Sequence, residues 1–160
     1  MTEGTKSYLF GCHHFFIHPL FVLISWHKEY RKWPKFWEVI CIFLHDIGHI
    51  GKQYLSDPKE KQKHWMLGAD IAYRLFGLKG FYFVAGHTTQ NGHPRSKLFV
   101  PDKKSWLITP NWWLQLNYII ENFQSEASQP KIWKAIVAEN AAKGFPKGNH
   151  QLYLDNKRVE

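Results

Sequence analysis

The sequence predicts an all-α protein that folds as a single-domain helical bundle over residues 1–160. Apolar residues recur at helical spacing through most of the chain, and alternation of apolar and polar residues never extends beyond a few positions. A length of 160 residues suits one domain with one sizeable core. An apolar share of 44% and an aromatic share of 17% exclude a disordered chain.

The first part of the chain is expected to hold two helices. Residues 1–16 are expected to be an irregular lead-in. Apolar spacing predicts a helix over residues 18–30, whose second residue is a proline that a first turn tolerates. After a break at residues 31–34, the proline that closes this break can open a helix over residues 35–44 or 35–46.

The middle of the chain begins with a polar segment, residues 53–63. Residues 56–58 read Ser-Asp-Pro, which predicts a turn or a helix start. The charged run over residues 59–63 is expected on the solvated surface. A helix follows over residues 64–76 and is expected to end at Gly77.

The next segment, residues 80–87, is short and apolar, so periodicity leaves helix and strand open. Residues 91–94 read Asn-Gly-His-Pro, which contains two turn signals. Pro101 is expected to begin a helix that runs towards Leu107.

The C-terminal part, residues 105–145, is rich in tryptophan and is expected to be helical. Helices are predicted over residues 111–123 and 130–143, the second with Ser128 as its N-cap and Gly144 at its end. A basic tail over residues 146–160 is expected to be loosely held. The tryptophans expected to pack in the interior are Trp106, Trp112, Trp113 and Trp133.

Charge and cysteine content bear on partners and compartment. A formal net charge of +8 favours anionic ligands. Cys12 and Cys41 form no paired motif and are expected to be reduced core thiols of a cytoplasmic protein. The most hydrophobic run, residues 15–26, is shorter than the ~20 residues of a membrane span, and the polar residues 1–8 are unlike a targeting segment. We therefore expect no membrane partner.

The most informative stretch, residues 39–51, reads VICIFLHDIGHIG. Its apolar run delivers His45 and Asp46 side by side, and burying both groups is costly unless something pairs with them. A divalent metal ion is a common partner, because imidazole nitrogen and carboxylate oxygen are both metal ligands. The alternative is a helix end at which the aspartate simply hydrogen-bonds the histidine.

Further histidines and an aspartate could complete a metal site. His18 lies on a predicted helix ahead of a strongly apolar face, so we favour it as a ligand. His14 is an alternative for the same role, whereas His13 is expected in a loop or on the surface. Asp102 could be a ligand or a simple helix cap.

The chain presents, in this order, His18, His45-Asp46, His64, His87 and Asp102. This order of histidines and aspartates resembles the signature of the HD-domain superfamily of metal-dependent phosphohydrolases. The resemblance covers about residues 11–104, implies an HD-domain-like helical bundle, and favours a helix over residues 80–87. It implies one or two divalent ions (Mn, Mg, Fe, Co or Ni). The implied metal ligands are His18, His45, Asp46, His64, His87 and Asp102.

The resemblance also implies catalytic roles. Asp46 would position or deprotonate a water molecule, while His64 and His87 would bind a second ion, contact phosphate or protonate the leaving group. The residues expected to bind the substrate phosphate are Lys52, Arg95, Lys103 and His49. Many members have lysine where this chain has His49, and the Gly-Tyr-Pro tripeptide of the cyclic-di-GMP phosphodiesterases is absent, so that substrate is not carried over.

The expected function is therefore hydrolysis of a phosphate ester or anhydride bond in a nucleotide or related small phosphate. One alternative is a di-iron oxygenase of the same superfamily, because the full ligand set is present. Another is a non-catalytic module that binds a nucleotide or nucleic acid through basic and aromatic residues, which is possible but not favoured.

Overall fold

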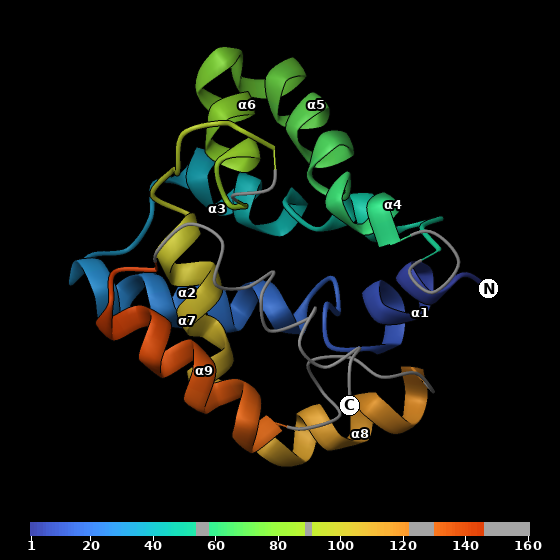
Figure 1. Cartoon of the computed structure of the whole chain (residues 1–160). Coiled ribbons are helices and arrows are strands. Elements are labelled where there is room, and N and C mark those ends of the chain that lie inside the picture. Colours follow the sequence, from blue (N-terminus) through green and yellow to red (C-terminus); the bar gives the residue numbers. More distant parts are fainter. Residues whose placement is uncertain (54–57, 89–90, 122–129, 146–160) are drawn as a thin grey trace.

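The computed structural model describes residues 1–53, 58–88, 91–121 and 130–145, and within these ranges every regular element is a helix (Figure 1). The all-α prediction is confirmed. In chain order the elements are α1 (Glu3–Phe10), α2 (Ile17–Tyr30), α3 (Phe36–Leu44), the 3-10 turn η1 (Ile47–His49), α4 (Pro58–Gln62), α5 (Trp65–Phe76), α6 (Leu78–Ala85), α7 (Phe99–Ile108), α8 (Asn111–Glu121) and α9 (Pro130–Ala142).

One part of the core is enclosed by α2, α3, α5 and α6. Its buried residues are Val22, Trp26, Cys41, Ile42, Ala69, Ala72, Phe83, Val84, Ala85 and Leu98. A single residue, Gly77, joins α5 to α6 with a φ of +68°, which glycine adopts at no steric cost. A Cβ on Gly80 would lie 2.4 Å from the carbonyl oxygen of Ala72, so the two helices can pack backbone to backbone only with glycine here.

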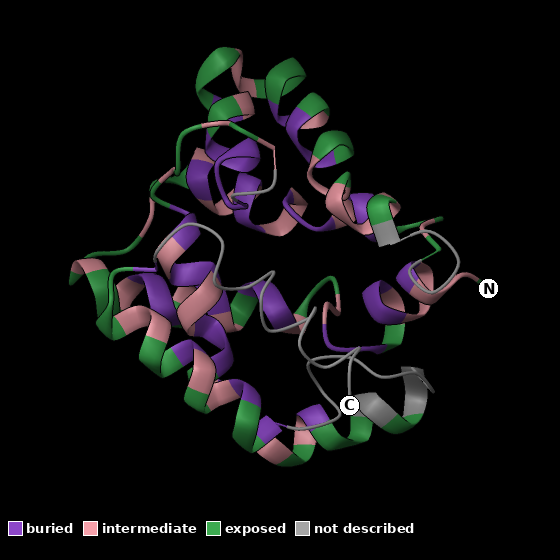
Figure 2. Ribbon diagram, viewed as in Figure 1, coloured by how far each residue is buried: buried purple, intermediate pink, exposed green. Residues whose placement is uncertain are grey.

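A second part of the core holds α7 against α8 and α9. Its buried residues are Cys12, Phe99, Trp106, Leu114, Trp133, Val137 and Phe145. In Figure 1, α2 and α7 lie between α3, α5 and α6 on one side and α8 and α9 on the other. Figure 2 shows buried residues concentrated on α2, α3 and α7, while α5 and α9 turn exposed faces outward. The N-cap residue of α7, Leu98, belongs to the first part of the core, whereas Phe99 and Trp106 of the helix itself belong to the second.

Most predicted helices are found within a few residues of their expected bounds. The ambiguous segment 80–87 lies largely in α6. Within the described ranges, no helix combines the length and the apolar character needed to cross a bilayer. The predictions for Ser56, Asp57, Ser128 and the tail over residues 146–160 concern residues outside the described ranges.

The expected irregular lead-in over residues 1–16 is wrong in its first half, because α1 forms there. The Thr2 hydroxyl oxygen accepts a hydrogen bond from the Thr5 N–H at 3.3 Å and caps the helix. Gly4 then packs on the turn η1: its N–H donates to the carbonyl of Lys52 at 3.0 Å, and a Cβ here would lie 2.2 Å from the carbonyl oxygen of His49. Tertiary packing holds a helix that apolar periodicity does not reveal.

Candidate metal centre

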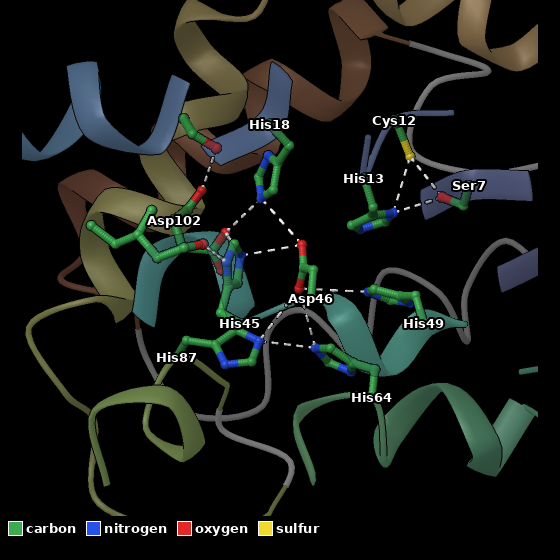
Figure 3. A network of polar contacts seen from close by, with 12 residues as sticks. Ser7, Cys12, His13, His18, His45, Asp46, His49, His64, His87 and Asp102 are labelled. Carbon is green, nitrogen blue, oxygen red and sulfur yellow. Dashed lines mark hydrogen bonds and ion pairs between the residues drawn. The ribbon is translucent and has the colours of Figure 1, made fainter. Parts of the chain in front are cut away.

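The predicted ligands converge from separate parts of the chain onto one buried cluster (Figure 3). His18 comes from α2 and Asp102 from α7, while His45 and Asp46 follow the end of α3. His64 immediately precedes α5, and His87 lies two residues beyond α6. All of these residues are buried except His64, which is half-buried.

Asp46 is the centre of this cluster because its two carboxylate oxygens face different histidine pairs. Oδ2 lies 3.3 Å from His18 Nε2 and 3.2 Å from His45 Nε2. Oδ1 lies 3.7 Å from His87 Nε2 and 3.9 Å from His64 Nε2. This carboxylate can thus bridge two ions, each of which would be held by one histidine pair.

The first group, His18, His45 and Asp102, has the donor spacing of a metal site. Asp102 Oδ1 lies 3.1 Å from His18 Nε2 and 3.5 Å from His45 Nε2. Metal–ligand bonds of 2.0–2.2 Å place two donors of one tetrahedral ion about 3.3 Å apart. His45 Nε2 is fully buried and makes no hydrogen bond of acceptable geometry. Its neighbours at 3.2 and 3.5 Å are the carboxylates of Asp46 and Asp102, so an ion between the three side chains of this group would have a donor from each.

The second group, Asp46, His64 and His87, brings two imidazole nitrogens face to face. Nε2 of His64 and Nε2 of His87 are only 2.9 Å apart. The Nδ1 atoms of His64 and His87 lie 2.6 Å from the Lys61 carbonyl oxygen and 2.5 Å from the Val84 carbonyl oxygen. A carbonyl can only accept, so both Nδ1 atoms carry the proton and both Nε2 lone pairs of the neutral rings point at each other. A cation at this position would turn that repulsion into coordination.

The same orienting hydrogen bond recurs at His45, whose Nδ1 donates to the Ile42 carbonyl at 2.6 Å. In each case the acceptor is the carbonyl three residues earlier, and for His45 it lies in the last turn of a helix, where carbonyls lack a partner. Hydrogen bonds of this kind fix the tautomer and the direction of histidines that bind metals.

Two glycines explain why these segments can meet. A Cβ on Gly48 would lie 1.7 Å from the carbonyl oxygen of His64, and a Cβ on Gly68 would lie 2.4 Å from that of Leu44. A larger residue at Gly48 would push the start of α5 away from the turn η1, and one at Gly68 would push α5 away from the end of α3. The glycines that follow His45-Asp46 and His64 in the sequence therefore allow the backbone contact that sets His64 beside Asp46.

The charges of the metal-free cluster differ between its two groups. Burial by itself lowers the pKa of His45, but the carboxylates of Asp46 and Asp102 outweigh it and raise this pKa to about 10. Burial lowers the pKa of His64 and takes that of His87 well below its usual range. The first group thus holds a proton between carboxylates, and the second presents neutral imidazoles.

The carboxylates behave in the opposite sense. Burial alone would raise the pKa of Asp46 and of Asp102. The neighbouring charge of His45 for Asp46, and of Lys103 for Asp102, instead holds both pKa values well below the usual range. Both side chains are ionised at neutral pH, as metal ligands must be.

Two of the four predicted phosphate-binding residues lie at the cluster. Lys103 Nζ donates to Asp102 Oδ2 at 2.8 Å, and His49 Nε2 lies 3.6 Å from Asp46 Oδ1. Their contacts with a substrate remain predictions.

The other two have partners elsewhere. Lys52 pairs with Glu60 at 2.8 Å. The Arg95 guanidinium donates to the carbonyls of Gly144 and Phe145 and lies over the ring of Phe99. Their predicted role is not supported by these contacts.

The predictions for the remaining histidines and tryptophans were partly right. His14 Nδ1 accepts from the Phe16 N–H at 3.2 Å near the start of α2, so His18, not His14, faces Asp46. His13 lies in a loop, as expected, but it is half-buried, and its ring centroid lies 4.4 Å from that of His49 with the two rings tilted. Trp106 is buried, and its ring lies 5.6 Å from that of His18. The fold of α1 and the path of α7 bring these two side chains to the cluster; the sequence predicted an interior position for Trp106 but not its contact with His18.

The other tryptophans divide between interior and surface. Trp133 is buried as predicted, whereas Trp112 is exposed, so the packing role predicted for Trp112 is wrong.

No family model, no curated protein and no solved structure matches this chain. Fold and site together define a helical protein with buried histidine and aspartate groups that could hold metal ions.

Proposed function

We propose that this protein is a metal-dependent phosphohydrolase of the HD-domain type that acts on a nucleotide or a related small phosphate. The observation that carries the proposal is the placement of Asp46, whose two oxygens face two separate histidine pairs. Two ions held a few ångström apart suit hydrolysis of phosphate esters, because they can stabilise both the attacking and the leaving oxygen.

The residues of the cluster would divide the work of hydrolysis. A bound divalent ion lowers the pKa of a coordinated water from ~15.7 towards ~7 and so supplies hydroxide at neutral pH. Asp46, ionised and buried, would orient that water through whichever oxygen lone pair is not used for coordination. The orienting hydrogen bonds of His45, His64 and His87 keep the imidazoles in place without rearrangement during the reaction.

The direction of substrate approach follows from exposure. The side chains of His18, His45 and His87 are at most 3% exposed, whereas His64 is 12% and Lys103 is 27% exposed. Unlike these three buried histidines, His64 and Lys103 can thus be reached by a substrate. The Lys103 ammonium would meet the phosphate there, and the net charge of +8 would favour arrival of an anion.

Phosphate release from a panel of nucleotides and small phosphate esters, with Mn, Mg, Co and Fe, tests this proposal. The wild-type chain should hydrolyse at least one member, and the Asp46→Asn variant should not. Absence of turnover with every metal, in protein shown by elemental analysis to be metal-loaded, would refute the hydrolase proposal.

A di-iron oxygenase is the second candidate, because two histidine groups that share one carboxylate also suit a pair of irons. Iron content of aerobically purified protein and oxygen consumption with small phosphonates or polyols separate the candidates. Oxygen uptake without phosphate release from esters would favour the oxygenase.

A further inference from the structure

His13 and His49 form a third potential ligand group with Asp46, beside the two groups already described. Ligand atoms from these three side chains all lie within 4.8 Å of one another. His13 belongs to the loop between α1 and α2, and His49 ends the turn η1. Figure 3 shows both on the side of Asp46 that is away from Asp102.

The position of His13 is built by α1. Nδ1 of His13 lies 2.8 Å from the hydroxyl oxygen of the buried Ser7. Gly4, one turn earlier in the same helix, contacts the backbone of His49 and fixes α1 against η1. The contact of Nδ1 with Ser7 fixes the direction of the His13 ring. An outer hydrogen bond that orients the ring in this way is typical of metal-binding histidines.

The distances favour coordination over a hydrogen bond. Nε2 of His49 lies 3.6 Å from Oδ1 of Asp46, which is too long for a hydrogen bond but close to the separation of two donors on one ion. The His13 and His49 rings lie 4.4 Å apart at an interplanar angle of 33°, so both edges can face a common point. His49 is almost fully buried and belongs to a charged cluster, where an apolar packing role would be costly.

We infer that His13, His49 and Asp46 form a third cation site, for a divalent transition metal such as zinc or iron(II). Two imidazoles and one carboxylate, with further positions left for water or substrate, are a common donor set for these ions. The inference shares with the proposed function the view that Asp46 binds metal, but it does not depend on hydrolysis. A third ion would add positive charge without adding a carboxylate, which suits a substrate with several negative charges.

The competing interpretation is that His49 completes the second group and that His13 only packs against it. The rings of His49 and His64 are stacked at 4.5 Å, so His49 could serve either position. His13 distinguishes the two, because it belongs only to the third group.

Metal stoichiometry of the metal-free 160-residue chain, titrated with Co²⁺ and with Zn²⁺, tests the inference. Elemental analysis counts the ions, the Co²⁺ absorption spectrum reports their coordination, and circular dichroism checks the fold. The variants are His13→Asn and His13→Asp, which differ in their ability to offer a carboxylate. His14→Asn is the matched control, since the neighbouring imidazole accepts N–H groups near the start of α2 and an asparagine oxygen can do the same.

The wild type and His14→Asn should bind one ion more than His13→Asn, and His13→Asp should regain that ion with weaker affinity. Saturation of the wild type at two ions would overturn the third site and leave the hydrolase proposal standing. Retention of all ions by His13→Asn in folded protein would overturn it equally. Failure of phosphate release with three ions bound would instead refute the hydrolase alone.

Discussion

The two main groups of potential metal ligands in the cluster contain similar histidines but differ in charge. The first group contains a carboxylate of its own, Asp102, and shares Asp46 Oδ2 with it. The second has only the shared Asp46 Oδ1 and two imidazoles whose lone pairs oppose each other. The Asp46 carboxylate therefore lies between the anionic first group and the nearly neutral second group.

This difference implies an order of filling. An ion in the first group meets two carboxylate oxygens from different residues, whereas an ion in the second meets one. Coulomb attraction is strong in a buried site, so the first group is expected to bind more tightly. The second group, which contains the half-buried His64, is expected to exchange its ion more readily and to meet the substrate.

Removal of the shared Asp46 carboxylate should abolish the difference in metal affinity, because both groups should then lose their ions. Asp46→Asn is expected to lose both ions and to reduce activity by more than the about 10–100-fold that changes behind a metal ligand cause. In the wild type, each ion at about 100 times its Kd should raise the free energy of unfolding by about 2.7 kcal/mol and the Tm by roughly 5–10 °C. Differential scanning fluorimetry with and without chelator should show this shift in the wild type and not in the variant. A variant that keeps the shift would mean that Asp46 is not the bridge.

Single histidine variants should separate the two groups. His45→Gln is expected to lose the ion of the first group and His87→Gln that of the second. They are a matched pair, because each imidazole donates from Nδ1 to the carbonyl three residues earlier. Elemental analysis after dialysis should leave a weakly held ion in His45→Gln and a tightly held one in His87→Gln. Equal losses from the two variants would contradict independent positions.

The pH dependence of metal binding should also differ between the groups. In the metal-free chain the pKa of His45 is raised to about 10, so at neutral pH this ring carries a proton that an ion must displace. The pKa values of His64 and His87 are lowered by burial, and both rings are already neutral. Between about pH 6.5 and 8.5, affinity at the first position should rise about tenfold per pH unit, while affinity at the second changes little. Calorimetric titration in buffers of different ionisation enthalpy measures the released proton. The same pH slope of affinity at both positions would contradict a protonated His45 in the first group and neutral imidazoles in the second.

The sequence was sufficient to predict which residues converge on the cluster, because several of them lie close to helix ends. His45 and Asp46 follow the apolar run that forms α3, and the glycines after them mark the places where backbones touch. The bounds of α7 were less accurate: the helix begins at Phe99, so Pro101 lies in its first turn and the Asp102 carboxylate turns to His18 instead of capping the helix.

The third ligand group could not be predicted because it depends on tertiary contacts. The helix α1 has weak apolar periodicity, and it is held by its cap and by the packing of Gly4 on His49. Without α1 in the prediction, the loop that carries His13 had no defined path. Lys52 and Arg95 show a further limit: a cation near a site in the sequence can be predicted to bind phosphate, but its partners, here Glu60 and two main-chain carbonyls, are defined only by the fold.

The smallest expected effect concerns Lys103, which acts on both groups. Its ammonium lies 2.8 Å from Asp102 in the first group, and its charge helps to lower the pKa of His64 in the second. Lys103→Gln should leave the metal count unchanged and raise KM for a phosphate substrate roughly 3–10-fold, a modest effect because the lysine is partly exposed. It should also steepen the pH dependence at the second position, because His64 then holds its proton to higher pH. Lys104→Gln is the control, because the Lys104 ammonium pairs with Glu29 at 2.6 Å. An equal rise in KM for both variants would mean that Lys103 acts only through the net charge of the protein.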